Sequence, residues 1–256
     1  MDSNSGFITE IYSAIQGEGP LVGVRQIFVR FNVCDLRCKW CDTPESLEKT
    51  DLCRVETFAG SRKFEKIQNP INIEKLSLFI LSLSPQIHHS ISLTGGEPLL
   101  QADFLKTFLS LQKSFFSLPV LLETGGHRPD KLIEILPYID YVSMDIKLPS
   151  SSFCRPLWDE HSKFLSICFS EKKLTDLWVK IVVTSLTSFD ELKRAVNLVM
   201  DIVSKRKIEI FLQPVSPIND LHPPTPEEMI LIQTKLLEFY PHIRVVPQVH
   251  KLIGQI

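Results

Sequence analysis

The chain has 256 residues, 44% hydrophobic and 23% charged, which is the balance of a soluble globular protein. Its 28 basic and 30 acidic residues give a net charge of −2, which excludes whole-protein electrostatic attraction to nucleic acid or to an anionic membrane. No run is long and apolar enough to span a bilayer, and residues 1–6 lack a signal-peptide pattern. We therefore expect one domain, residues 1–256, in the cytoplasm, with no nucleic-acid or membrane partner.

Apolar runs rich in β-branched and aromatic residues alternate with helical patterns along the chain. The predicted strands are residues 8–14, 26–31, 90–93, 119–123, 141–146, 177–183, 208–212 and 244–246. The predicted helices are residues 73–83, 102–115, 129–136, 189–203 and 226–239. This alternation predicts an α/β fold of parallel βαβ units, with an incomplete (β/α) barrel as its natural closure. Functional loops are then expected at the carboxyl ends of the strands.

Two stretches interrupt the alternation. Residues 43–69 are polar with little periodicity, and we expect them to form an irregular excursion over the site that the preceding cysteines create. Residues 150–173 separate two predicted strands, and the sequence assigns them no role.

The loop after the strand at 26–31 carries three closely spaced cysteines, Cys34, Cys38 and Cys41. Thiolates select zinc, copper(I) or iron–sulfur clusters, and three within eight residues can converge on one metal centre. On a four-iron cluster, three cysteines leave one iron free, whereas electron-carrying clusters have every iron held by cysteine. A structural zinc site is the alternative, because zinc takes four protein ligands and Cys53 is a conceivable fourth. The six cysteines are not spaced as a disulfide framework, which favours a reducing compartment.

The C-x-x-x-C-x-x-C spacing, with the aromatic Trp40 before the last cysteine, resembles the cluster loop of the radical S-adenosylmethionine superfamily. Four further motifs resemble one family within it, the 7-carboxy-7-deazaguanine synthases. They are Ile15-Gln16-Gly17-Glu18-Gly19-Pro20, Arg30-Phe31, Cys41-Asp42-Thr43 and Thr94-Gly95-Gly96-Glu97-Pro98-Leu99. The resemblance implies a barrel of the radical S-adenosylmethionine type and three cofactors: a [4Fe-4S] cluster on Cys34, Cys38 and Cys41, S-adenosyl-L-methionine and Mg²⁺. It implies a carbon–nitrogen lyase that converts 6-carboxy-5,6,7,8-tetrahydropterin to 7-carboxy-7-deazaguanine with loss of ammonia, in queuosine (7-deazapurine) biosynthesis.

The resemblance also assigns residues to S-adenosylmethionine. Gly96 and Glu97 follow a strand, where glycine lets the backbone approach a ligand and the carboxylate can meet the methionine amino group. Two further strand ends, residues 143–147 and 213–216, resemble segments that line the cofactor pocket, although an ordinary strand terminus is the alternative for each. Their predicted cofactor contacts are Ser143, Asp145, Lys147 and Gln213.

By the same resemblance, Thr43 is the magnesium ligand, since a hydroxyl oxygen suits a hard cation that takes few protein groups. An ordinary turn residue is the alternative, and Asp42 is predicted to be a loop hydrogen-bond partner. The fork of Arg30 matches a substrate carboxylate. The predicted substrate contacts are the backbone of Ile15, with Gln16, Gly17, Arg30, Thr94, Glu123 and His250. The last residue, Ile256, departs from the small or proline residue that usually ends the family, so its contact stays open.

Two other functions stay open at this point. An activase that makes a glycyl radical on a partner enzyme shares the cysteine spacing, but it acts on a protein. A non-catalytic zinc or iron–sulfur module would have no substrate. The resemblance further implies a homodimer and an electron-donating flavodoxin or ferredoxin, without saying which reductant or which fate of the product applies.

Overall fold

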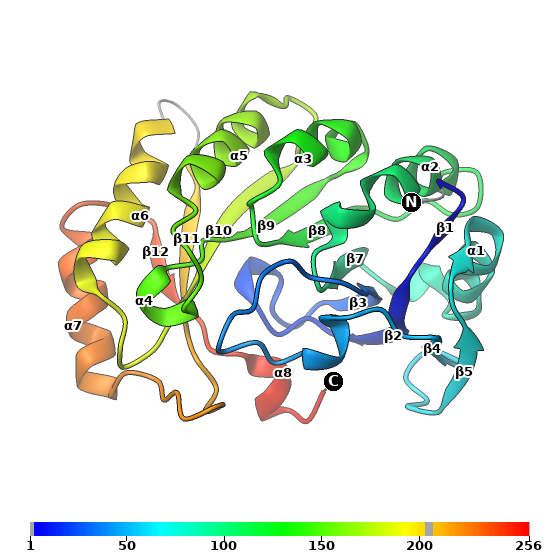
Figure 1. Ribbon diagram of the computed structural model, residues 1–256, viewed down its shortest axis with the longest axis horizontal. Coiled ribbons are helices and arrows are strands. Elements are labelled where there is room, and N and C mark those ends of the chain that lie inside the picture. The colour runs from blue at the N-terminus through cyan, green and yellow to red at the C-terminus, as the bar shows by residue number, and fades with distance from the viewer. Residues whose placement is uncertain (1–2, 203–206, 256) are drawn as a thin grey trace.

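The computed structural model describes residues 3–202 and 207–255, and its main element is a curved sheet of ten strands (Figure 1). The spatial order is β12-β11-β10-β9-β8-β7-β3-β2-β4-β5. The seven strands β3, β7, β8, β9, β10, β11 and β12 are parallel to one another. Strand β2 is antiparallel to β3, and β5 is antiparallel to β4. In chain order they are β2 (Ile8–Ile15), β3 (Arg25–Phe31), β4 (Leu52–Glu56), β5 (Phe64–Gln68), β7 (Ser90–Gly95), β8 (Val120–Thr124), β9 (Tyr141–Asp145), β10 (Asp176–Val183), β11 (Glu209–Pro214) and β12 (Ile243–Val245). A separate short pair joins β1 (Ser5–Gly6) and β6 (Ile71–Asn72).

Helices connect the consecutive parallel strands. In Figure 1 they form an arc around the outside of the sheet, from α1 at the right to α7 at the left. The longer ones are α1 (Ile73–Ser82), α2 (Ala102–Gln112), α3 (Pro129–Ile135), α5 (Trp158–Ser170), α6 (Phe189–Ile202) and α7 (Pro226–Leu237), and the short ones are α4 (Pro149–Ser152) and α8 (Val249–Leu252). Single 3₁₀ turns are η1 (Gly19–Leu21), η2 (Pro44–Ser46), η3 (Pro85–Ile87), η4 (Pro98–Gln101) and η5 (Leu136–Tyr138).

The main core lies between the sheet and this layer of helices. Parallel strands that are covered on both faces carry near-continuous apolar runs, and Val29, Leu93 and Leu122 in neighbouring strands are completely buried. They belong to one apolar cluster with Phe108 of α2 and Phe164 of α5. The apolar contact between each helix and the strands beneath it therefore fixes the positions of the strand ends.

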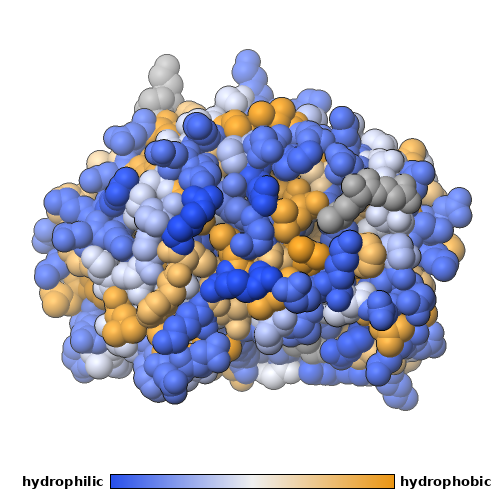
Figure 2. All heavy atoms as spheres, in the orientation of Figure 1, coloured by the Kyte–Doolittle hydropathy of each residue, from blue (hydrophilic) through white to orange (hydrophobic). Residues whose placement is uncertain are grey.

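The outer surface mixes apolar and polar side chains. Figure 2 shows one face, on which hydrophobic residues occur in separate groups among hydrophilic ones. No helix among the described residues is long and apolar enough to cross a membrane.

All predicted strands and helices are present, with ends that differ by at most three residues. The final residue of the predicted helix 189–203 lies outside the described residues. Within the part of the chain that the structure describes, β12 and β5 are the two edges of the sheet and do not pair with each other. The prediction of an incomplete (β/α) barrel is therefore confirmed, while the single domain over 1–256 stays a prediction.

The expectation for residues 43–69 is wrong. This stretch contains β4 and β5, an antiparallel hairpin that extends the sheet beyond β2. In β4 the side chains of Cys53 and Val55 are buried while Leu52 and Arg54 are exposed, which is a period of two. Five residues with one buried face give too short a pattern to distinguish from a polar loop.

Residues 150–173 do not interrupt the alternation. They contain α4 and α5, and α5 buries His161, Phe164, Leu165 and Cys168, which recur at helical spacing. The helix therefore supplies the expected connection between β9 and β10.

Replacing Phe108 with alanine should lower the free energy of unfolding by about 3–5 kcal/mol, because its side chain is completely buried and its removal leaves a cavity. Phe58, in the β4–β5 turn, is 59% exposed and is the matched control, for which about 0.5 kcal/mol or less is expected. Denaturant titration of the cluster-free protein measures both values. Equal losses would contradict the assignment of Phe108 to the core.

His161 predicts a pH dependence of stability. Burial lowers its pKa to about 4, so between pH 6.5 and 4 the unfolded chain binds a proton that the folded protein does not. Stability contributed by the neutral ring is therefore lost as the pH falls. The free energy of unfolding of the parent protein should fall between pH 7 and pH 5, and about 2 kcal/mol of this fall should be absent from His161→Gln. A variant that retains the parent's pH slope in denaturant titrations would rule this out.

Candidate active site

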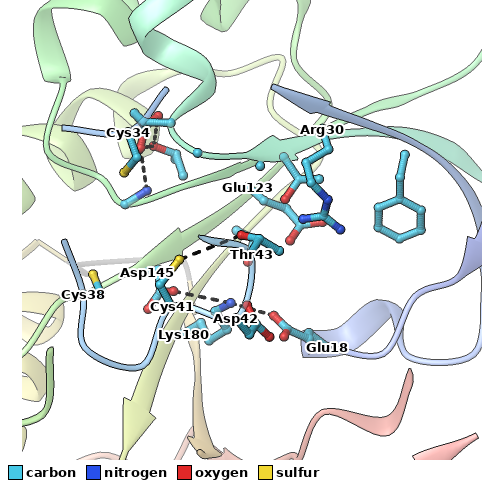
Figure 3. A pocket seen from close by; sticks show the side chains of 18 of the residues that line it. Glu18, Arg30, Cys34, Cys38, Cys41, Asp42, Thr43, Glu123, Asp145 and Lys180 are labelled. Atoms are coloured by element: carbon cyan, nitrogen blue, oxygen red, sulfur yellow. Dashed lines mark hydrogen bonds and ion pairs between the residues drawn. The ribbon is translucent and has the colours of Figure 1, made fainter. Parts of the chain in front are cut away.

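A cavity of about 300 Å³ lies at the carboxyl ends of the parallel strands. Its wall contains every residue predicted for the site except Gln213. Those present are Ile15, Gln16, Gly17, Arg30, Cys34, Cys38, Cys41, Thr43, Thr94, Gly96, Glu97, Glu123, Ser143, Asp145, Lys147 and His250. Figure 3 shows the three cysteines on one side of the pocket, with Arg30 and Glu18 on the other and Thr43 between them.

Backbone hydrogen bonds hold the start of the cysteine loop against the end of β7. Gly96 N donates to Phe31 O at 2.9 Å, and Glu97 N donates to Val33 O at 2.8 Å. A Cβ on Gly95 would lie 2.4 Å from Phe31 O, and one on Gly96 would lie 2.2 Å from Val33 O. The two glycines are therefore required by the close approach of the cysteine loop itself. Gly95, at φ +115°, also adopts a conformation that other residues rarely take.

The three thiols fit a cluster better than a single ion. Among residues 3–202 and 207–255, no three histidine, cysteine or acidic side chains are grouped closely enough to hold one metal ion. Cys34, Cys38 and Cys41 instead line one wall of the cavity, which suits a larger thiolate-bound cluster. Burial raises the pKa of the Cys34 thiol to about 11, and contact with Cys154 is the main cause of the raised pKa of Cys38. Metal binding would have to displace both protons.

Glu97 is held by the loop that follows β8. Thr124 Oγ1 donates to one of its carboxylate oxygens at 2.8 Å, and Gly125 N donates to the other at 2.9 Å. Leu99 N also donates to Oε1 at 3.1 Å, so Oε2 is the oxygen with a lone pair directed to a further donor, and it can still accept from a ligand. The carboxylate is 1% exposed and lines the cavity, which suits the predicted contact with an ammonium group.

His127 connects this carboxylate to the cysteine loop. Its Nε2 lies 2.8 Å from Asp35 Oδ1, and its Nδ1 lies 3.7 Å from Glu97 Oε2. Burial raises the pKa of Asp35, but hydrogen bonds and charge from His127 and Arg128 outweigh it and lower the pKa overall. His127 Nδ1 has no hydrogen-bond partner among the described residues, and neither has Asp145 Oδ1. Both residues line the cavity, so a polar ligand there would find polar atoms to pair with.

Lys180 is the central cation of the site. Its Nζ lies 2.6 Å from Glu18 Oε2 and 3.4 Å from Asp145 Oδ2, and Lys147 Nζ lies 2.8 Å from the same Asp145 oxygen. Burial lowers the pKa of Lys180, but the charges of Glu18 and Asp145 raise it well above its ordinary value. Burial raises the pKa of Glu18, and the nearby lysine reverses this, so its pKa falls overall. Lys147 Nζ also lies 4.3 Å from the centre of the Trp40 ring.

Glu123 and Gln16 form a second buried network. Gln16 Nε2 donates to Gln26 Oε1 at 2.9 Å and to Glu123 Oε1 at 3.1 Å, and Ser92 Oγ donates to the same Glu123 oxygen at 2.5 Å. Gln16 Oε1 accepts from the backbone nitrogens of the two residues that follow it. Burial raises the pKa of Glu123. The amide of Gln16 is therefore engaged by the protein, as is one carboxylate oxygen of Glu123.

The guanidinium of Arg30 is already partly engaged. Its Nε donates to Glu10 Oε1 at 2.8 Å, and its Nη2 donates to the Tyr12 hydroxyl at 2.6 Å. Burial lowers the pKa of Arg30, but Tyr12 and Glu10 raise it overall. Burial raises the pKa of Tyr12 to about 12, so this phenol stays protonated at neutral pH. Arg30 therefore remains charged, in a fixed orientation at the cavity wall.

The C-terminal segment covers one side of the cavity. Val249 N donates to Gly17 O at 3.0 Å, and a Cβ on Gly17 would lie 2.3 Å from His250 N. Lys251 Nζ donates to Asp42 Oδ2 at 2.7 Å, which confirms the predicted hydrogen-bonding role of Asp42. Burial raises the pKa of Asp42, but Lys251 outweighs it and holds the pKa at about 2. The open question of the terminal residue, Ile256, lies outside the described residues.

Two predicted site residues, Gln213 and Thr43, make contacts within the protein that the sequence did not indicate. Gln213 lies outside the cavity wall, where its Nε2 donates to Glu18 Oε1 at 3.1 Å. Thr43 lines the cavity, with its Oγ1 4.0 Å from Cys41 Sγ. The roles predicted for both stay predictions.

Sequence reasoning missed Lys180, Glu18 and His127. Lys180 did carry a signal, since it is a lone charged residue inside the apolar run of β10. Glu18 stands in a recognised motif but had no assigned role, and His127 follows the Gly125-Gly126 pair without any spacing pattern of its own.

Comparisons with known proteins identify the family of this chain. The sequence model of the Radical SAM superfamily matches residues 28–167, more than half of the chain. The chain is 36% identical over 252 residues to the 7-carboxy-7-deazaguanine synthase of Geobacter sulfurreducens, covering 97% of each protein. It is 32% identical over 268 residues to the enzyme of the same name from Methanothermobacter thermautotrophicus, covering 96% of each.

Solved structures share the fold. The crystal structure of QueE from Escherichia coli has a TM-score of 0.59 and 19% identity, covering 95% of this chain and 94% of that one. A radical SAM methyltransferase from Sphaerobacter thermophilus has a TM-score of 0.58 and 10% identity, covering 93% and 77%. The fold is thus the partial barrel of radical S-adenosylmethionine enzymes, whose cofactors are a [4Fe-4S] cluster and S-adenosylmethionine. The chain belongs to the radical S-adenosylmethionine superfamily and, within it, to the family of 7-carboxy-7-deazaguanine synthases.

Proposed function

We propose that this chain converts 6-carboxy-5,6,7,8-tetrahydropterin to 7-carboxy-7-deazaguanine, with loss of ammonia, in the cavity at the strand ends. The observation that carries the proposal is that three cysteines, a buried glutamate and an oriented arginine line one cavity. A thiolate set for a cluster, a carboxylate for the cofactor's amino group and a cation for a substrate carboxylate are the groups this reaction calls for.

The cysteine loop would hold the cluster through Cys34, Cys38 and Cys41, and Glu97 would bind the amino group of S-adenosylmethionine. When bound, these cofactors supply the electron transfer and the radical chemistry of the superfamily. Gly96, Ser143, Asp145 and Lys147 would line the cofactor's side of the cavity. The buried position of Glu97 excludes water from its contact, which strengthens it.

The substrate would lie between Arg30 and Glu123. Glu10 and Tyr12 engage two nitrogens of Arg30, so its Nη1 is the donor left for a carboxylate. Gln16 and Ser92 engage Glu123 Oε1, so Glu123 would hydrogen-bond to the ring through its other oxygen. The backbone of Ile15, Gln16, Gly17, Thr94 and His250 would complete the substrate wall, and Thr43 would bind Mg²⁺ beside the substrate.

The wider setting is proposed from the family. The cluster requires a reductant, for which a flavodoxin or ferredoxin is proposed, and a reducing cytoplasm suits exposed iron and thiols. We also propose that the chain acts as one domain over residues 1–256, as a homodimer, without a nucleic-acid or membrane partner.

Anaerobic reconstitution with iron and sulfide tests the function. The expected product is a brown four-iron protein that cleaves S-adenosylmethionine and converts the carboxylated tetrahydropterin with no partner protein added. A colourless protein with bound zinc would instead identify a non-catalytic module. A loaded protein that cleaves the cofactor but leaves the pterin unchanged would point to an activase.

Replacing Thr43 with alanine should raise the Mg²⁺ concentration for half-maximal turnover by about tenfold or more, because a direct oxygen ligand is lost. The visible absorbance of the cluster should be unchanged. Thr57→Ala, at an exposed position in the β4–β5 turn, is the control. If the magnesium titration of Thr43→Ala matches the parent, Thr43 is not a ligand.

Arg30→Lys keeps the charge but loses the paired contacts to Glu10 and Tyr12 that orient it, so the KM for the carboxylated pterin should rise about 10- to 100-fold. Arg54→Lys is the matched control, since Arg54 Nη1 lies 3.5 Å from Glu10 Oε2, yet Arg54 does not line the cavity. Steady-state kinetics measure both variants. A rise in KM of the same size for Arg54→Lys would assign the effect to Glu10.

A further inference from the structure

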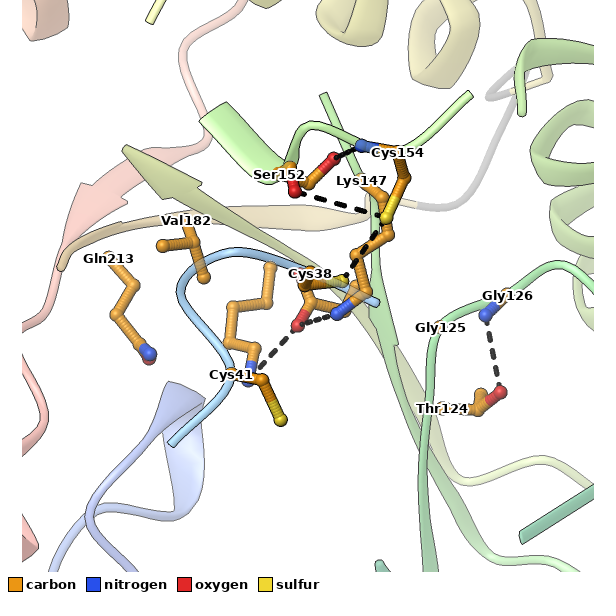
Figure 4. Close-up of polar contacts among 12 residues, drawn as sticks. Cys38, Cys41, Thr124, Gly125, Gly126, Lys147, Ser152, Cys154, Val182 and Gln213 are labelled. Carbon is orange, nitrogen blue, oxygen red and sulfur yellow. Dashed lines mark hydrogen bonds and ion pairs between the residues drawn. The ribbon is translucent and has the colours of Figure 1, made fainter. Parts of the chain in front are cut away.

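A fourth cysteine contacts the cysteine loop. Cys154 lies between α4 and α5, and its Sγ is 3.6 Å from Cys38 Sγ, although 116 positions separate the two in the chain (Figure 4). This is contact between two sulfur atoms. We propose that Cys38 and Cys154 form a redox modification site, at which a disulfide bond joins them in the cluster-free protein.

Backbone contacts hold the two segments together beside this pair. Lys39 N donates to Ser152 O at 2.9 Å, and Cys154 N donates to Ser152 Oγ at 3.2 Å. Phe153, between Ser152 and Cys154, ends α4 in the left-handed conformation (φ +61°) and directs the chain back to the cysteine loop. The Lys39 ammonium lies 4.8 Å from the centre of the Phe153 ring. Contacts of the residues next to Cys38 and next to Cys154 thus hold the two cysteines close together.

The remaining movement is small. A disulfide has a sulfur–sulfur distance of about 2.05 Å, so the two atoms have to close by roughly 1.5 Å. Rotation of the side chains can supply a movement of this size. Cys41 does not compete for Cys38 in this arrangement, because its own sulfur is directed to Thr43 Oγ1 at 4.0 Å and away from Cys38 (Figures 3 and 4).

Oxidised glutathione is a sufficient oxidant. One thiolate of the pair attacks a glutathione sulfur, expels one glutathione thiolate and leaves a mixed disulfide on the protein. The second protein thiolate then attacks the protein sulfur of that mixed disulfide, and the second glutathione leaves. The protein loses two protons and two electrons, and one oxidised glutathione becomes two reduced ones.

The consequence for cluster loading rests on the proposed function, in which Cys38 is a cluster ligand. A sulfur bound to iron is not available for a disulfide, so the cluster and the bond exclude each other. In the cluster-free protein the disulfide protects Cys38 from irreversible oxidation to sulfinic acid, and a thiol reductant restores the free Cys38 thiol.

Mass spectrometry tests the bond directly. Cluster-free protein is treated with oxidised glutathione, its free thiols are alkylated, and it is digested without reduction. The expected product is a peptide pair that links Cys38 to Cys154 and lacks two hydrogen atoms. Cys154→Ala should lose this pair, and Cys53→Ala, at a buried cysteine of β4, should retain it. An alkylated Cys38, or a Cys38 linked to Cys34 or Cys41, would overturn the proposal.

Cluster-loaded protein separates this proposal from the proposed function. The linked peptide should appear only as iron is removed by a chelator, in step with loss of the visible absorbance. A linked peptide that accumulates while the absorbance is unchanged would overturn the exclusion between bond and cluster. If the protein never binds a cluster, the proposed function fails, whereas the linked peptide of the cluster-free protein still decides the disulfide.

Discussion

The ion pair between Lys180 and Glu18 is the contact on which the shape of the site depends. Lys180 lies in β10, and Glu18 follows the end of β2. In the order of the sheet, β9, β8, β7 and β3 separate these two strands, so the 2.6 Å contact between the two side chains requires a strongly curved sheet. Removing one partner of such a buried pair leaves an uncompensated charge, which typically costs about 3–5 kcal/mol. Lys180 also contacts Asp145, so the same cation orders both the wall proposed for the substrate and the wall proposed for the cofactor.

Close backbone packing fixes the position of the cysteine loop. Gly95 and Gly96 let the end of β7 contact the backbone of Phe31 and Val33, immediately before the first cysteine. The Glu97 carboxylate is then positioned by the same turn that positions the thiols. A cofactor bound to both would find its two attachment points on one rigid unit.

The sequence predicted the alternating elements because each long strand and helix has a clear period. Strand geometry predicted the edge at which the site lies, and the resemblance to the family supplied most residues of the cavity wall. It did not predict which charges pair. Lys180 stands inside an apolar strand, but its partner Glu18 is 162 positions away, and a pattern of spacings holds no information on such a contact. Gln213 was assigned to the cofactor by resemblance; its side chain donates to Glu18, a residue that itself lines the cavity. The β4–β5 hairpin was missed because one buried face over five residues is too short a signal.

The C-terminal segment connects the two edges of the open sheet. It leaves the sheet at β12, donates from Gln248 to Glu18 and from Lys251 to Asp42, and accepts at Gly254 O from Arg62, in the β4–β5 turn. These contacts bridge the side on which the strands do not close. A segment outside the sheet therefore helps to hold the two edge strands relative to each other, so a change in its length would alter the opening between β12 and β5 without touching any strand.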